Sequence, residues 1–145
     1  MQVLFHSDED AVVKKKVSLY INEMKNGRRI AIIDRSFLAH NVYQMLLKPL
    51  GYSLLRFNNL KNFKDNRIDK MGCCALLINS NVFGKQFDTH LNWMRKEAPF
   101  HSLEKIFFCN SEEKKIQEAL KKLPHSHVVV KPFYPQQLKE TLEKM

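Results

Sequence analysis

The chain has 145 residues, of which 44% are hydrophobic, so it can bury a core without help from a disulfide or a structural metal. Three cysteines are too few for a disulfide framework or a zinc site, and we expect a reducing, cytoplasmic setting. The net charge of +9 favours acidic partners, while the lack of an apolar run of about 20 residues predicts no membrane insertion.

Residues 1–27 predict a separate N-terminal helical extension. The acidic run Ser7-Asp8-Glu9-Asp10 is typical of a helix start, and Asn26-Gly27 of a helix end. Between them lies an apolar stripe at helical spacing, formed by Val13, Val17, Tyr20, Ile21 and Met24. This helix could pack on its own domain, pair with a second copy, or be the end of a longer signalling helix.

From residue 28 onward, strand and helix patterns alternate. Short apolar runs predict strands at 30–33, 52–57, 73–79, 106–108 and 127–130, with the second near an edge and the third at the centre of the sheet. Five strands separated by helices indicate an α/β domain over 28–145, with a parallel sheet and helices on both faces.

Five helices connect or follow these strands. Ser36 caps the first helix, and its expected inward residues are Leu38, Val42, Met45 and Leu46. A weaker helix is expected over 58–71, bearing Leu60, Phe63 and Met71. The third helix is expected to bury Phe87, Leu91 and Met94. The fourth begins after a capping pair of Asn110 and Glu113, and its expected inward residues are Ile116, Ala119, Leu120 and Leu123. The fifth begins at Pro135 and is expected to bury Leu138, Leu142 and Met145.

Polar residues end or directly follow four of the predicted strands. They are Asp34, Asn79, Cys109 and Lys131, and the last is followed by Pro132 and Phe133. Because the carboxyl ends of parallel strands meet at one edge of a sheet, we expect these four side chains to share one rim, where ligands of α/β proteins bind.

The positions of these residues, at intervals of 45, 30 and 22, resemble those of the receiver domain of bacterial two-component response regulators. The resemblance covers residues 28–145, and its most specific element is Lys131-Pro132-Phe133. It implies a flavodoxin-like (βα)5 three-layer sandwich with strand order 2-1-3-4-5, to which the N-terminal helix is added.

Two positions depart from that family's phosphorylation chemistry. The acid pair that helps to hold magnesium reads Asp34-Arg35 here, and a guanidinium cannot act as a metal ligand. The phosphoacceptor position holds Asn79, whose amide lacks the carboxylate needed for covalent phosphoryl capture. We therefore expect no metal, no cofactor and no catalytic residue, and a degenerate receiver that is not an enzyme.

The readout residues differ as well. Cys109, a weak hydrogen-bond donor, replaces the hydroxyl residue that binds the phosphoryl group, and Val128 replaces the aromatic residue of the switch. Lys131 is retained, and we expect it to pair with Asp34 or Asn79. Together these changes predict a domain that is fixed in one conformation.

Simpler interpretations stay open beside this one. Asp34 and Lys131 could form a structural pair without any ligand, or Arg35 and Lys131 could hold a small anion. Cys109 is expected to be a packed residue with no role as a nucleophile. His125 and His127 could bind a metal only with further ligands, and a solvated pair is the simpler interpretation.

The first hypothesis is a phosphorylation-independent module in bacterial signal transduction that binds another protein or a second copy of itself. Its expected contact face comprises the fourth helix of the receiver pattern, the fifth strand and the last helix. The residues it offers are Lys114, Lys115, Lys121, Lys122, Tyr134 and Gln137. The alternative is a basic module that binds nucleic acid or another anionic surface through residues 28–72, with the helical row Lys61, Lys64, Arg67 and Lys70 as its contact.

Overall fold

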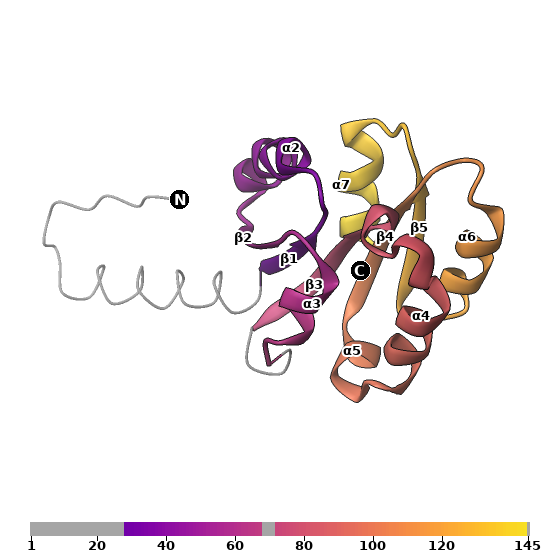
Figure 1. Cartoon of the computed structure of the whole chain (residues 1–145). Coiled ribbons are helices and arrows are strands. Elements are labelled where there is room, and N and C mark those ends of the chain that lie inside the picture. The colour runs from indigo at the N-terminus through magenta and orange to yellow at the C-terminus, as the bar shows by residue number, and fades with distance from the viewer. Residues whose placement is uncertain (1–27, 68–71, 145) are drawn as a thin grey trace, which may run out of the picture.

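The computed structural model describes residues 28–67 and 72–144. Five parallel strands form one sheet in the order β2-β1-β3-β4-β5, as predicted (Figure 1). Their bounds are β1 Arg29–Ile33, β2 Ser53–Phe57, β3 Cys73–Asn79, β4 Glu104–Cys109 and β5 Ser126–Val130. The predicted N-terminal helix, Lys70, Met71 and Met145 lie outside the described residues.

Helices cover both faces of this sheet. Their bounds are α2 Phe37–Leu47, α3 Leu60–Lys64, α4 Phe87–Lys96, α5 Ala98–Ser102, α6 Lys114–Lys121 and α7 Pro135–Glu143. One core cluster joins the sheet to α3, α4, α5 and α6, and the other joins it to α2 and α7. Alternate residues of β1 serve the two clusters: Ala31 and Ile33 on one side, and Ile30 and Ile32 on the other. The fold is therefore the predicted three-layer α/β sandwich.

The register brings the ends of the strands to one edge. Ile33 pairs with Ile78, Asn79 with Phe108, and Cys109 with Val130. Asp34 and Lys131 each follow the last residue of a strand. The polar positions picked out from the sequence therefore lie at the same end of the sheet.

The first helix of the domain, α2, is rotated relative to the prediction. Leu38, Val42 and Met45 were expected inside, but they are 73%, 46% and 75% exposed. The buried residues of α2 are His40, Tyr43 and Leu47. The prediction was wrong because α2 is apolar on more than one side, and His40 and Tyr43 carry polar groups that reach Asp34 from the inner side.

The second predicted helix is shorter than expected, because α3 ends at Lys64. Lys64 is also not a free surface cation: its ammonium lies 4.7 Å from the centroid of the Trp93 ring and 3.1 Å from Nδ1 of His90. Burial lowers the pKa of Lys64. The proposed row of Lys61, Lys64, Arg67 and Lys70 is therefore not one continuous helical face in the part of the chain that the structure describes.

The later helices follow the predicted patterns more closely. Their buried residues include Leu91 and Met94 in α4, Leu120 in α6, and Leu138 and Leu142 in α7. Pro135 is the first residue of α7, where its missing N–H leaves no bond unmade. The short helix α5 was not predicted. Residues 28–67 and 72–144 contain no helical stretch with the length and hydrophobicity of a membrane span.

Candidate functional site

Asp34 is the centre of the polar rim predicted from the sequence. It directly follows β1, and its side chain is completely buried. The amide Nδ2 of Asn79, the last residue of β3, donates a hydrogen bond of 2.9 Å to Oδ2 of Asp34. Adjacent parallel strands therefore bring together two residues that are 45 positions apart in the sequence.

Three further donors hold the Asp34 carboxylate. Oδ1 accepts from the side-chain amide of Asn81 and from the backbone N–H of Ser36, both at 2.8 Å. Oδ2 accepts from the hydroxyl of Tyr43 at 3.4 Å. Burial and the negative charge of Asp34 raise the pKa of Tyr43 well above its usual value, so its hydroxyl remains a donor. Each carboxylate oxygen is thus satisfied by uncharged groups.

Lys131 completes the network from the end of β5. Its ammonium donates to Oδ1 of Asn79 at 2.9 Å, so of the two expected partners the structure shows Asn79. The backbone N–H of Lys131 donates to the carbonyl of Cys109 at 2.8 Å, and the Lys131–Pro132 peptide bond is cis. One amide thus links the carboxylate to the ammonium, because Asn79 donates from its nitrogen and accepts at its oxygen.

Asn81 is a site residue that the sequence analysis missed. Besides bonding Asp34, its side-chain oxygen accepts from the backbone N–H of Arg35 at 3.2 Å, and its backbone N–H donates to Oδ1 of Asn79. The pattern Asn79-Ser80-Asn81 at the end of a central strand was the available signal. Arg35 itself is exposed at the rim.

The side of the rim near β4 is packed and provides no reactive thiol. Cys109 is fully buried, and burial raises its pKa to about 11, with the nearby Glu113 carboxylate adding to the shift. Glu113 accepts hydrogen bonds of 2.7 Å from the Ser80 hydroxyl and from the backbone N–H of Asn110. Val128 is half-buried against the core cluster. The thiol therefore stays protonated near neutral pH.

The opposite end of the sheet holds a second buried charge, Lys105 in β4, which the sequence analysis did not single out. Its ammonium donates to the backbone carbonyls of Phe100, His101 and Leu103 at 3.0, 3.4 and 2.6 Å. Burial lowers its pKa to about 8, although the neighbouring Glu104 opposes this shift. The ammonium of Lys105 thus caps the carboxyl end of α5 by binding backbone carbonyl oxygens there.

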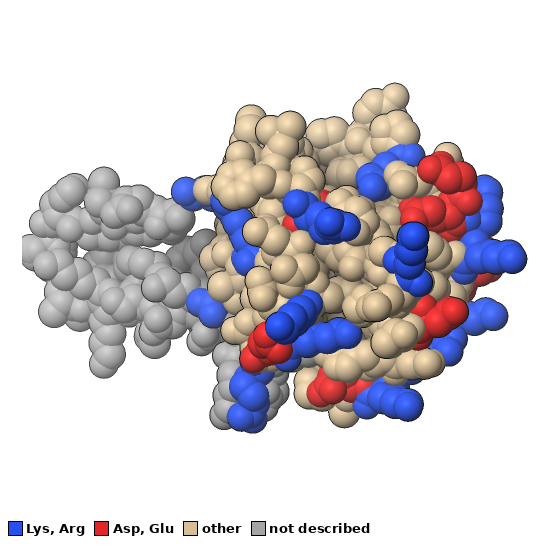
Figure 2. Space-filling view, in the orientation of Figure 1, with Lys and Arg blue, Asp and Glu red and all other residues tan. Residues whose placement is uncertain are grey.

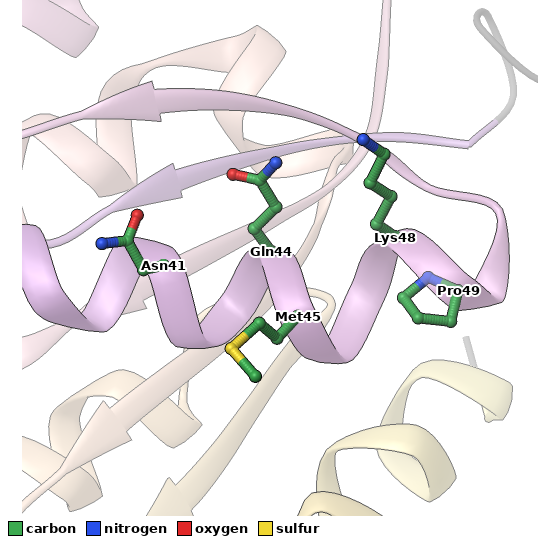
Figure 3. A pocket seen from close by; sticks show the side chains of 5 residues that line it. All are labelled: Asn41, Gln44, Met45, Lys48 and Pro49. Carbon is green, nitrogen blue, oxygen red and sulfur yellow. The ribbon is translucent and has the colours of Figure 1, made fainter. Parts of the chain in front are cut away.

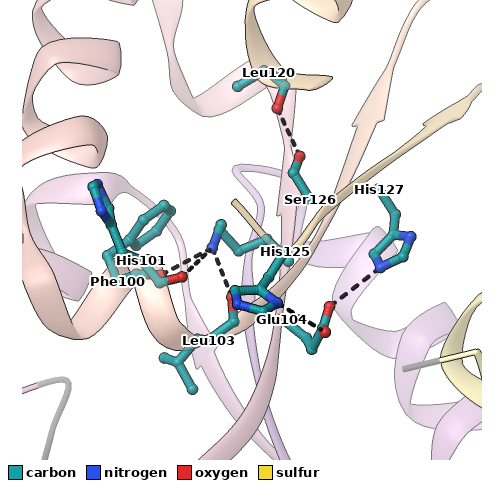
Figure 4. Close-up of polar contacts among 9 residues, drawn as sticks. Phe100, His101, Leu103, Glu104, Leu120, His125, Ser126 and His127 are labelled. Atoms are coloured by element: carbon teal, nitrogen blue, oxygen red, sulfur yellow. Dashed lines mark hydrogen bonds and ion pairs between the residues drawn. The ribbon is translucent and has the colours of Figure 1, made fainter. Parts of the chain in front are cut away.

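The histidine pair noted in the sequence lies at this end. Glu104 binds both of them: Nδ1 of His125 lies 3.4 Å from Oε1, and Nε2 of His127 lies 3.2 Å from Oε2 (Figure 4). Within residues 28–67 and 72–144, no group of three or more His, Cys, Asp or Glu side chains is arranged to hold a metal ion. The histidines act here as partners of one carboxylate.

The residues of the expected partner face differ in their availability. Tyr134 is 77% exposed, and the four lysines of the face are exposed on or next to α6. Gln137 has a structural task, because its Oε1 accepts from the backbone N–H of Tyr134 at 2.6 Å and so closes the start of α7. The lysines are Lys114, Lys115, Lys121 and Lys122.

Comparison with known proteins gives a consistent result for the fold alone. No protein-family model and no curated protein matches the sequence. Solved structures do match. A CheY-like response regulator receiver domain protein from Methanospirillum hungatei aligns with a TM-score of 0.66 at 17% identity, over 81% of this chain and 91% of that one.

Two further structures agree. The signal receiver domain of an HD domain-containing protein from Pseudomonas fluorescens gives a TM-score of 0.67 at 17% identity, over 81% of this chain and 92% of that one. A chemotaxis response regulator of Vibrio cholerae gives 0.62 at 16% identity, over 81% and 97%. The chain therefore has the fold of the CheY-like receiver domains of response regulators.

Proposed function

We propose that the chain is a phosphorylation-independent, receiver-like module that acts in signal transduction by binding another protein. The observation that supports this best is the closed network at the rim. Asn79 donates to Asp34 and accepts from Lys131, so the carboxylate and the ammonium are engaged with the protein itself. A domain whose switch residues hold one another has no need of a phosphoryl group to fix its conformation.

The residues at the rim do not fit a magnesium ion. Magnesium prefers a near-octahedral shell of oxygens that includes one or two carboxylates. The carboxylate at this rim is that of Asp34, and its oxygens already accept hydrogen bonds of 2.9 Å or less from Asn79, Asn81 and Ser36. The neighbouring Arg35 brings a permanent positive charge, which repels a divalent cation.

Asn79 likewise lacks what a phosphoacceptor needs. Its amide oxygen carries no full negative charge, and the nitrogen occupies the place of a second carboxylate oxygen. Cys109 offers no substitute, because its buried thiol has a pKa of about 11. We accordingly propose no catalytic residue and no turnover.

The phosphorylation claim is tested by titrating the full chain with magnesium plus beryllofluoride, and separately with acetyl phosphate. We expect no saturable amide NMR shift around Asn79 and no added phosphoryl mass. Saturable shifts at Asn79 and Lys131, or a stable mass increase, would contradict the proposal. The double variant Asn79→Asp with Arg35→Asp is the comparison protein, and we expect magnesium-dependent shifts near residue 79 only there.

The protein-binding claim needs a separate measurement. Capture of partners by the full chain, repeated with Tyr134→Ala, tests the expected face without disturbing the core, because Tyr134 is 77% exposed. A complex that withstands added salt and is lost in this variant supports the proposal. The alternative, an anionic ligand bound by residues 28–72, predicts binding that falls steeply with salt and is weakened by Lys61→Glu.

A further inference from the structure

The outward face of α2 is unusually apolar for a helix in contact with water. Phe37, Leu38 and Met45 are 72%, 73% and 75% exposed, and Val42 is 46% exposed. The eleven residues of α2 include no Asp, Glu, Lys or Arg. Helices on a protein surface normally carry charged or polar residues on the outer side. This face therefore has the composition of an interface.

Two hollows flank the exposed ridge of α2. One is lined by Asn41, Gln44, Met45, Lys48 and Pro49 (Figure 3). The other lies toward α7, and its apolar lining comes from Val42, Leu46, Pro132, Phe133 and Pro135. In the space-filling view few charged side chains lie over α2, whereas they gather over α6 (Figure 2). A ridge between two grooves is a suitable shape for a second helix to pack against.

We propose that residues 13–24 of the same chain form a helix that covers this face of α2. Those residues lie outside the described structure, and their sequence carries the apolar stripe Val13, Val17, Tyr20, Ile21 and Met24. A stripe of this kind is stable in water only when another apolar surface covers it. The apolar stripe of this segment and the exposed apolar face of α2 could therefore cover each other.

The point at which the chain enters the fold favours this pairing. Arg28 donates from its guanidinium to the carbonyl of Leu50 and lies over the Tyr52 ring, 4.4 Å from its centroid. Leu50 ends the short 3-10 helix Lys48–Leu50 that follows α2 directly. Residue 28 is therefore fixed at the carboxyl end of α2. Met24 is at most about 14 Å away along an extended chain.

Lengths and directions also agree. A helix over 13–24 would place its stripe along about 16 Å, and the exposed apolar residues of α2, from Phe37 to Met45, extend over about 12 Å. Because Met24 is tethered near the carboxyl end of α2, the two helices would run parallel. Met24 would then lie near Met45, and Val13 near Leu38 and Phe37.

The tether decides between this segment and a second copy of the chain. A segment joined by a short linker competes at an effective concentration of about 1 mM or more. A second copy at the micromolar concentrations of a typical experiment is far more dilute. This contact is separate from the proposed loss of phosphorylation.

Hydrogen exchange of the full chain tests the proposal. In the wild-type protein at low concentration, we expect the amides of residues 13–24 to exchange at least about tenfold more slowly than the same amides in an unfolded chain. The double variant Leu38→Glu with Met45→Glu should remove this protection. Both positions are largely exposed, so amides of β3 should stay protected and report that the domain is folded.

Two controls make the result specific. Thr89→Glu with Asn92→Glu places the same two charges at exposed positions of α4, on the other face of the sheet, and should leave residues 13–24 protected. Val17→Glu with Ile21→Glu should uncover α2 and raise the binding of a hydrophobic dye. Unprotected residues 13–24 in the wild type would overturn the proposal. So would protection that the α2 variant leaves unchanged, or protection that rises with concentration together with a doubled mass.

Discussion

Two side chains of opposite charge are fully buried at opposite ends of the sheet, Asp34 after β1 and Lys105 near the start of β4. In both cases uncharged dipoles take the place of water. Asp34 accepts from side-chain amides, a backbone N–H and a phenol, and Lys105 donates to backbone carbonyls. Burial of a charge is tolerated only with such partners.

The two sets of partners differ in their distance along the chain. The carbonyls that hold Lys105 belong to residues 100, 101 and 103, so this site is a local closure of α5. The amides that hold Asp34 come from residues 79 and 81, across the sheet. We infer that the Asp34 site ties the tertiary fold together, whereas the Lys105 site ends one helix.

The largest expected effect comes from removing the acid. Asp34→Ala leaves the buried amide of Asn79 and the half-buried amide of Asn81 without their acceptor, and we expect the free energy of unfolding to fall by about 3 kcal/mol. Urea denaturation measures it. Asp65→Ala, which removes an exposed acid at the end of α3, should change it by less than about 0.5 kcal/mol. Equal losses in the two variants would show that the hydrogen bonds to Asp34 contribute no more to stability than an exposed acid does.

A smaller effect, dependent on pH, is expected at Lys105. Its pKa is about 8 in the folded protein and 10.5 in an ordinary environment, so between these values the unfolded chain binds more protons. Raising the pH from 7 to 9 should therefore stabilise the wild type by about 1 kcal/mol relative to Lys105→Met. Denaturation curves at several pH values test this.

The free energy of unfolding of Lys105→Met is subtracted from that of the wild type because the ionisation of cysteine thiols changes stability in the opposite direction. The raised pKa of Cys73 and Cys109, about 11 each, makes thiol ionisation favour the unfolded chain as the pH passes about 9. That contribution is common to both proteins. Parallel stability curves for the wild type and the variant would show that the Lys105 ammonium is not desolvated.

A weaker effect on stability is expected at Lys131. Lys131→Met removes one hydrogen bond to Asn79, but the lysine is half-exposed and water can replace it. We expect a loss of about 0.5 kcal/mol in urea denaturation. A loss as large as that of Asp34→Ala would show that the ammonium, and not the uncharged donors, sustains the buried carboxylate.

The last test measures chemical reactivity in place of stability. It uses the thiol of Cys109, at the opposite end of β4 from Lys105. Because Cys109 is buried and its pKa is about 11, alkylation at pH 8 should be about 100-fold slower in the folded protein than in urea. Mass spectrometry of the digested protein measures it. Equal rates would show that the rim opens readily to solvent.

Much of the fold followed from the sequence, because five apolar runs and the helix signals between them leave little choice of architecture. Chain order alone placed Asp34, Asn79 and Lys131 at one rim, since parallel strands end together. The start of α7 could also be predicted from one residue, because the fixed φ angle of Pro135 suits the first turn of a helix.

The rest depended on contacts that no local pattern contains. The rotation of α2 follows from His40 and Tyr43 binding Asp34, whereas a count of aliphatic residues favoured Leu38 and Met45. The burial of Lys105 is equally hidden, because lysine is normally exposed and its three acceptors appear only when α5 forms.

The amide of Asn79 is directional, because it donates to Asp34 from its nitrogen and accepts from Lys131 at its oxygen. A carboxylate at position 79 would present only acceptors, so the oxygen replacing Nδ2 would face Oδ2 of Asp34 at about the 2.9 Å now bridged by an N–H. A single Asn79→Asp change should thus weaken the fold, because two carboxylate oxygens would face each other with no hydrogen atom between them.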